Sequence, residues 1–417
     1  MAFNLPLPWR ERVGERGIVE AYILDWLNML VRWFHMITGI AWIGASFYFV
    51  WLDNHLLAPK EKSAADKGVS GELWAVHGGG FYNAQKYGVA PATLPEPLHW
   101  FKWEAYTTWI SGFFLLCLMY YVGAEVYLID RNVADIGKVA AIAIGVGSMA
   151  GGWLVYDLLC KSPLGKNDAA LGGVLFALTV GAAWGLCEVF SGRGAYIHFG
   201  AMLGTIMVAN VFFVIIPGQK ELVRAKVEGR EPDPIHGVRG KQRSVHNTYF
   251  TLPVLFTMIS SHYAMTYGHA RNWLILAAIA FAGAAIRVYF VSRHKGRASP
   301  LPAIAGVVAL ALVAFAIAPA SRGNVSTTAT PTEEFNRVSA IVQARCAACH
   351  AQSPTQPGFA VAPKGVMLDT PERIAAQAVP INQQVSSRVM PLANLTGMTD
   401  AERETIAQWF ARGALTQ

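Results

Sequence analysis

The chain has 417 residues, of which 53% are hydrophobic and only 15% are charged, and its formal net charge is +7. Soluble globular proteins average about 25% charged residues. The composition therefore excludes a single water-soluble globule, a disordered chain and a protein that wraps nucleic acid. The five cysteines are too few for a disulfide scaffold. We expect a membrane protein whose excess of Lys and Arg reports its orientation in the bilayer.

Apolar runs near the length of about 20 residues that crosses a bilayer recur through the first three quarters of the chain. We predict about eight transmembrane helices, at residues 26–51, 104–129, 137–159, 170–190, 196–217, 246–266, 272–292 and 300–319. The predicted fold class is therefore all-α, with a polytopic membrane helix bundle over residues 1–320. A Ser/Thr-rich linker at 321–332 then leads into a small, helix-rich domain at 333–417.

The orientation follows from the basic residues between the predicted spans. The segments 218–245 and 293–299 carry seven and three Lys or Arg residues, and such basic segments stay in the cytoplasm. The long segment 52–103 then falls on the same side. An even number of spans places the domain at 333–417 in the periplasm of a bacterial inner (plasma) membrane.

The most specific motif is the run Cys346-Ala-Ala-Cys349-His350. In this CxxCH pattern two thiols attach haem covalently and the adjacent His becomes an axial iron ligand. A zinc site would need a second ligand pair, and a redox CxxC is expected in a βαβ context; the sequence offers neither. We therefore predict one covalent haem c in a class I-like cytochrome c domain.

The second axial ligand of the iron is expected from a downstream methionine. We favour Met390 over Met398, because the following Pro391 fixes the loop and keeps the sulfur forward, and we expect Met367 in the core. Helices are predicted at 333–345 and 399–412, the second with a Thr399–Glu402 capping box. Trp409 and Phe410 should pack on the first helix.

Ionisable residues within the spans are candidate functional residues, because they are costly in a bilayer. His35, His198 and His262 fall in the outer half, in three different spans, where imidazoles could ligate an additional haem or copper. Helix capping and neighbour hydrogen bonds are the alternative roles. His246 and Glu104 belong to the inner side, with Asp157, Asn247, Tyr249 and the Gly-rich stretch 78–80. These glycines are not expected to follow a strand, so we predict no dinucleotide-binding turn there.

Four segments together resemble the membrane-bound bacterial urate oxidase (urate hydroxylase) family, which fuses a membrane domain of eight spans to a C-terminal cytochrome c. They are RWFHMITGIAWIGASFYFVWLDNHL, ELWAVHGGGFYNAQKY, HWFKWEAYTTW and HNTYFTLPVLFTMISSHY. The resemblance implies purine catabolism: urate is oxidised to 5-hydroxyisourate, and the electrons pass to the haem. A soluble cytochrome c or a terminal oxidase would then be the acceptor. The resemblance assigns no catalytic residue.

Oxidation of urate needs a base that activates water. His246 or Glu104 could act in a cytoplasmic site, and His35, His198 or His262 in an outer one. A cytoplasmic site would leave about 30 Å of bilayer before the haem, which favours either an outer site or a relay cofactor inside the membrane. Two other classes stay open: a quinol–cytochrome c type electron-transfer protein, and a copper- or haem-handling transporter.

Overall fold

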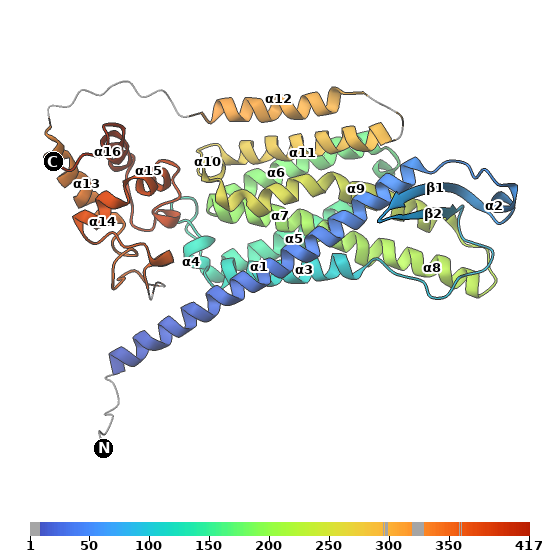
Figure 1. The fold of residues 1–417 in the computed structure, drawn as a ribbon, viewed down its shortest axis with the longest axis horizontal. Coiled ribbons are helices and arrows are strands. Elements are labelled where there is room, and N and C mark those ends of the chain that lie inside the picture. Colours follow the sequence, from blue (N-terminus) through green and yellow to red (C-terminus); the bar gives the residue numbers. More distant parts are fainter. Residues whose placement is uncertain (1–8, 295, 297–298, 319–328, 358, 360) are drawn as a thin grey trace, which may run out of the picture.

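The computed structural model describes residues 9–294, 296, 299–318, 329–357, 359 and 361–417. These residues are mostly helical, and several of the helices are apolar. The long helices run along one axis as a bundle (Figure 1). They are α1 (Trp9–His55), α3 (Trp103–Leu116), α5 (Lys138–Lys161), α6 (Asp168–Cys187), α7 (Gly192–Asn210), α9 (Pro234–Ile259), α11 (Asn272–His294) and α12 (Leu301–Ala316).

Short elements connect or extend these helices. They are α2 (Lys62–Asp66), the π-helical turns η1 (Cys117–Tyr121) and η3 (Val211–Ile215), α4 (Ala124–Tyr127), α8 (Ile216–Val227), α10 (Ala264–Tyr267), and the 3-10 turns η2 (Pro163–Lys166) and η4 (Ser260–His262). Through η3, α7 continues into α8, so the predicted basic loop at 218–245 is mostly helical. The helices on either side of this segment, α7 with α8 and then α9, therefore extend beyond their apolar runs.

Each predicted span coincides with a helix, but the helices differ in how well they suit a membrane. Among the described residues, five are long and apolar enough to cross one: Tyr22–His55, Lys138–Lys161, Asp168–Cys187, Gly192–Val227 and Asn272–His294. The first half of α9 is too basic, α3 is interrupted by a π-helical turn, and α12 has only 16 residues. The prediction of eight spans therefore stays a prediction.

The segment 52–103 contains a β-hairpin that the sequence analysis missed. Strand β1 (Val69–His77) pairs antiparallel with β2 (Gly80–Tyr87), and His77 lies opposite Gly80. Gly78 and Gly79, with φ of 56° and 80°, form the two-residue turn, in which both residues need positive φ. The interpretation that these glycines do not follow a strand was wrong. Because a second strand and not a helix follows, they still form no dinucleotide-binding turn.

The two ends of the bundle carry different structures (Figure 1). The hairpin and α8 lie at one end, together with the start of α9 and the end of α11. At the other end lie α4, α10 and the C-terminal domain, and α1 also begins there. We call these the hairpin end and the C-domain end.

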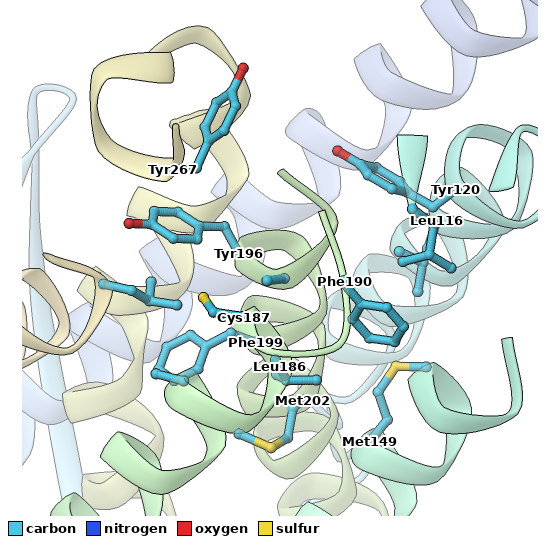
Figure 2. Packing of buried hydrophobic residues seen from close by; sticks show 14 of the residues in the cluster. Leu116, Tyr120, Met149, Leu186, Cys187, Phe190, Tyr196, Phe199, Met202 and Tyr267 are labelled. Atoms are coloured by element: carbon cyan, nitrogen blue, oxygen red, sulfur yellow. The ribbon is translucent and has the colours of Figure 1, made fainter. Parts of the chain in front are cut away.

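The main hydrophobic core lies between α5, α6, α7 and the segment 116–129. Figure 2 shows Met149 and Met202 at one side of this core, with Phe190 and Phe199 between them and the tyrosines. The hydroxyls of Tyr120 and Tyr267 point away from the two methionines. These two hydroxyls therefore lie toward the C-domain end, whereas the hydroxyl of Tyr156, in the same core, bonds to His246.

The C-terminal domain has its own core and four helices: α13 (Pro331–Arg345), α14 (Pro371–Ala376), α15 (Ala378–Ser386) and α16 (Asp400–Ala411), with 3-10 turns η5 (Pro363–Gly365) and η6 (Leu392–Asn394). The Thr399–Glu402 capping box is confirmed. Trp409 is fully buried with its ring centroid 5.8 Å from that of Phe335 in α13, so the predicted packing of the two helices is confirmed. α13 begins two residues earlier than predicted, and most of the predicted linker lies outside the described residues.

Candidate functional site

The CxxCH segment forms a tight turn at the end of α13. The amides of Cys349 and His350 both donate to the carbonyl of Cys346, at 3.1 and 2.9 Å. His350 Nδ1 donates to the carbonyl of Val366 at 2.9 Å. That bond fixes the tautomer and leaves Nε2 free, the arrangement by which proteins hold a metal-ligating imidazole. The turn therefore fits covalent attachment of haem.

The two thiols are poorly suited to redox or zinc chemistry. Burial, with a smaller contribution from Cys349, raises the pKa of the Cys346 thiol to about 12, whereas reactive and metal-binding cysteines need the thiolate. Among the described residues, no three His, Cys, Asp or Glu side chains come together as a metal site. Both observations weaken the alternatives that the sequence offered for CxxC.

The Met390 loop is held from behind by a buried arginine. Arg403 of α16 donates to the carbonyls of Val385 and Met390, at 2.9 and 2.7 Å. Met390 itself is half-buried, whereas Met398 is only 3% exposed within the domain core. Met367 is half-buried and not in the core. The placement suits Met390 as a ligand and Met398 as a core side chain.

The Met390 loop also faces the helix bundle. Val389 packs against the main core of the bundle, and η6 lies against α4. Close to Gly268, which follows α10, lie the carbonyl of Ser387 and the Cβ of Arg388. The side of the domain that carries the expected iron ligand is therefore the side that docks on the bundle.

Tyrosines surround one arginine beneath this docking point. Arg193, in the first turn of α7, donates from Nε to the hydroxyl of Tyr120 at 3.2 Å. Its guanidinium lies over the ring of Tyr127, 5.1 Å from the centroid, and Tyr267 is close enough to interact electrostatically. Arg193 makes no ion pair with a described carboxylate.

The three histidines of the predicted outer group do not meet. His35 donates from Nδ1 to the carbonyl of Thr108 at 3.0 Å, against Gly112 of α3. His198 is fully buried, donates to the carbonyl of Gly194 at 2.8 Å and lies 3.3 Å from the hydroxyl of Tyr121. Gly112, which contacts His35, and Tyr121, which contacts His198, are nine helical residues apart. This corresponds to about 14 Å along the helix axis. His262 is exposed on η4.

His246 belongs to a closed polar network near the hairpin end. Arg243 of α9 donates to Asp157 of α5 at 2.8 Å and to Asn210 of α7 at 3.3 Å. Asn210 donates to the Tyr156 hydroxyl at 3.2 Å, which in turn lies 2.8 Å from His246 Nδ1. Further bonds complete the network: Asn210 to Asn247 at 2.8 Å, Asn247 to the carbonyl of Met207 at 2.9 Å, and Lys161 to Asp157 at 2.6 Å.

Toward the hairpin end, Glu104 and Arg287 each have a buried side-chain atom without a hydrogen-bond partner among the described residues. The Oε2 of Glu104, at the start of α3, is buried without a hydrogen-bond donor. Arg287 of α11 is 7% exposed, and its Nε is buried without an acceptor. Of the five candidates from the sequence, only Glu104 combines burial with an unpartnered titratable atom.

Sequence reasoning missed Arg193, Arg243 and Arg287. The signal was available, because any ionisable residue inside an apolar helix is a candidate for function. An open hollow of about 450 Å³ between residues 87–98 and α8 is lined by apolar and uncharged side chains. It therefore offers no recognition of an anion.

Taken together, the fold is mostly helical, with several apolar helices compatible with a membrane protein. A family model described as urate oxidase N-terminal matches residues 21–318. Because this match covers more than half of the chain, the chain belongs to this urate oxidase-related family, which points to an oxidoreductase. No curated protein and no solved structure matches it.

Proposed function

We propose that this protein is a membrane-bound urate oxidase that passes electrons to a covalent haem c in its C-terminal domain. Family membership over 21–318 supports the substrate. The observation that carries the electron route is the docking of the Met390 loop, through Val389 and η6, on the helix bundle. Cys346 and Cys349 would hold the haem, with His350 and Met390 as axial ligands.

The proposed reaction removes two electrons from urate. Urate and water give 5-hydroxyisourate, two protons and two electrons, with a new C–O bond at the ring-junction carbon. A haem held by Cys346, Cys349, His350 and Met390 would supply a one-electron acceptor, so the two electrons from each urate would leave in two steps. A soluble cytochrome c or a terminal oxidase would take them on.

Glu104 is the best-placed general base among the candidates. Its carboxylate has no donor to hold it, whereas His35, His198 and His246 are each engaged in hydrogen bonds and His262 is exposed. A base must be free to take the proton from water as it attacks. The other four keep hydrogen-bonding roles in this proposal.

The proposed setting is a bacterial inner membrane crossed eight times, with the C-domain end outside. Both the start of α1 and the C-terminal domain lie at that end (Figure 1), as an even number of crossings requires. The basic residues of α8 and of the first part of α9 lie at the hairpin end, which is cytoplasmic by the positive-inside rule.

Reduction of the haem without oxygen tests the function. Purified protein, oxidised and kept anaerobic, should have its haem reduced by added urate, with one urate reducing two haem equivalents. Cys349→Ala, which removes one thioether, should abolish turnover in air. Stoichiometric peroxide from urate would show that oxygen is the acceptor. Haem that is reduced by quinol and never by urate would instead support the quinol–cytochrome c alternative.

The methionine ligand is tested separately by spectroscopy. Met390→Ala should remove the methionine-to-iron charge-transfer band and lower the haem potential, because thioether ligation raises it. Met398→Ala is the matched control and should keep the band. The reverse result would assign the ligand to Met398.

A further inference from the structure

Arg287 is an isolated positive charge inside the inner half of the bundle. Arg287 is 7% exposed, and its Nε is buried without an acceptor. Neither of its Nη groups donates to a described residue. Burying a charged group without a counter-charge or hydrogen bonds is strongly unfavourable, and such residues in membrane helices mark binding sites. The guanidinium therefore calls for an anionic partner that is not part of the described chain.

The nearest surroundings of Arg287 are aromatic and basic. Its guanidinium carbon lies 3.8 Å from the ring centroid of Phe47 in α1, and Tyr249 of α9 is within electrostatic range. Toward the hairpin end, His294 of α11 and His55 of α1 lie with ring centroids 4.9 Å apart. These groups offer flat faces for stacking and no negative charge.

The one carboxylate of α1 near this end is already neutralised. Asp53 is paired with Lys86 of the hairpin and with Lys241 of α9. Asp53 therefore cannot serve Arg287. Asp53 carries one negative charge against the two lysines, so this group of side chains keeps a net positive charge, which attracts anions.

We propose that Arg287, beside the ring of Phe47, binds a planar heterocyclic anion of purine size that enters from the hairpin end. This inference rests on the proposed function and names urate as the ligand. A guanidinium fork pairs with two adjacent acceptors of a planar anion. The ring of Phe47 beside the guanidinium favours a flat ligand over a tetrahedral anion such as phosphate.

Binding can be measured without turnover. When the haem of the complete protein is first reduced, it cannot accept electrons, so equilibrium dialysis reports the affinity for urate alone. Arg287→Gln should weaken urate binding roughly 10- to 100-fold, the loss expected for charge-assisted hydrogen bonds. Arg287→Lys, which keeps the charge but loses the fork, should give an intermediate loss.

Arg193→Gln is the matched control. Arg193 also lacks an ion pair, but it lies at the C-domain end and already donates to Tyr120. This variant should bind urate as the wild type does. The Arg287→Gln protein should unfold at a temperature no lower than the wild type, because the substitution removes a buried charge without a partner.

The outcomes separate this site from the proposed function. If urate reduces the haem of the wild type but Arg287→Gln binds urate normally, the site is wrong and the function stands. If urate binds in an Arg287-dependent way but never reduces the haem, the site stands and the function falls. Equal displacement of urate by millimolar phosphate or chloride would show a general anion site and overturn the assignment to a planar ligand.

Discussion

Arg243 and Arg287 are both buried guanidiniums in the inner half of the bundle, 3% and 7% exposed, yet their surroundings are opposite. Arg243 donates to Asp157 and Asn210, and its guanidinium carbon lies 4.9 Å from the ring centroid of Tyr156. Arg287 lies against the ring of Phe47 and makes no hydrogen bond or ion pair with a described residue. The first charge is compensated by the fold itself, and the second is left for something that binds.

This contrast separates structural charges from functional charges in the bundle. A compensated network joins α5, α7 and α9 and fixes their relative positions, so its loss should appear as instability. An uncompensated charge lowers stability while the site is empty and raises it when a ligand arrives, through the mass-action effect of binding. Substitutions at Arg243 should therefore lower stability, whereas substitutions at Arg287 should weaken binding without lowering stability.

The largest effect is expected where the compensated pair is broken. Asp157→Leu would leave Arg243 without its counter-charge and with only its hydrogen bond to Asn210, and breaking a buried ion pair in this way costs about 3–5 kcal/mol. Thermal unfolding in detergent, followed by circular dichroism, measures the loss. A loss below about 1 kcal/mol would mean that water already solvates the network.

Removing both charges should recover much of that loss. The double variant Asp157→Leu/Arg243→Met replaces the pair by apolar groups, a change that is often neutral or stabilising by about 1–4 kcal/mol. Comparison of the two single variants with the double variant gives the coupling energy. If the double variant is no more stable than Asp157→Leu, the unpaired charge is not the cause of the loss.

A counter-charge placed beside Arg287 should compensate its charge in the way that Asp157 compensates the charge of Arg243. Phe47→Glu places a carboxylate beside the guanidinium and should make the protein more stable than Phe47→Gln, its uncharged control, by about 1–3 kcal/mol. Urate binding should be lost in the Glu variant, because the anion site is filled from within. Retained binding would place the ligand elsewhere.

A smaller effect is expected at the C-domain end. Arg193→Gln removes a hydrogen bond to Tyr120 and two cation–π contacts, together worth about 1 kcal/mol at a partly exposed site. The same unfolding measurement checks this value. A loss as large as that of Asp157→Leu would place Arg193 among the compensated, structural charges.

The smallest effect concerns a carboxylate in the soluble domain and depends on pH. The amide of Gln352, and then Arg373, hold the pKa of Asp369 below its ordinary value of 3.8. Since the folded pKa is the lower one, this interaction stabilises the domain above that value and is lost as the pH falls through the folded pKa. Asp369→Asn should therefore be less stable than the wild type at neutral pH, with the difference vanishing in acid.

A substrate at Arg287 also bears on the electron route. Arg287 is about 22 Å along α11 from Asn272 at the C-domain end. Electron transfer over such a distance would need a relay group, and His35, His198 and His262, which do not meet, would not hold it together. Acid extraction of non-covalent haem from the purified protein, with metal analysis, checks for it.

The sequence by itself determined the elements whose cause is local. Apolar runs located the long helices, and the Thr399–Glu402 box located the start of α16. CxxCH has a fixed spacing because one turn of chain must present both thiols and the imidazole, so Cys346, Cys349 and His350 could be selected without a structure. The hairpin was missed because alternation over 69–87 is weak, although the Gly78–Gly79 pair was its turn signal.

The tertiary structure decided which charges are satisfied, because partners in a bundle come from different helices. Nothing in the sequence distinguishes Arg243, whose partner lies 86 residues earlier, from Arg287, which has none. Likewise, His35, His198 and His262 share a predicted depth, but the packing of α3 against α1 and α7 keeps them apart. Depth can be counted along a chain at a fixed rise per residue, whereas contact depends on how each helix is rotated about its axis.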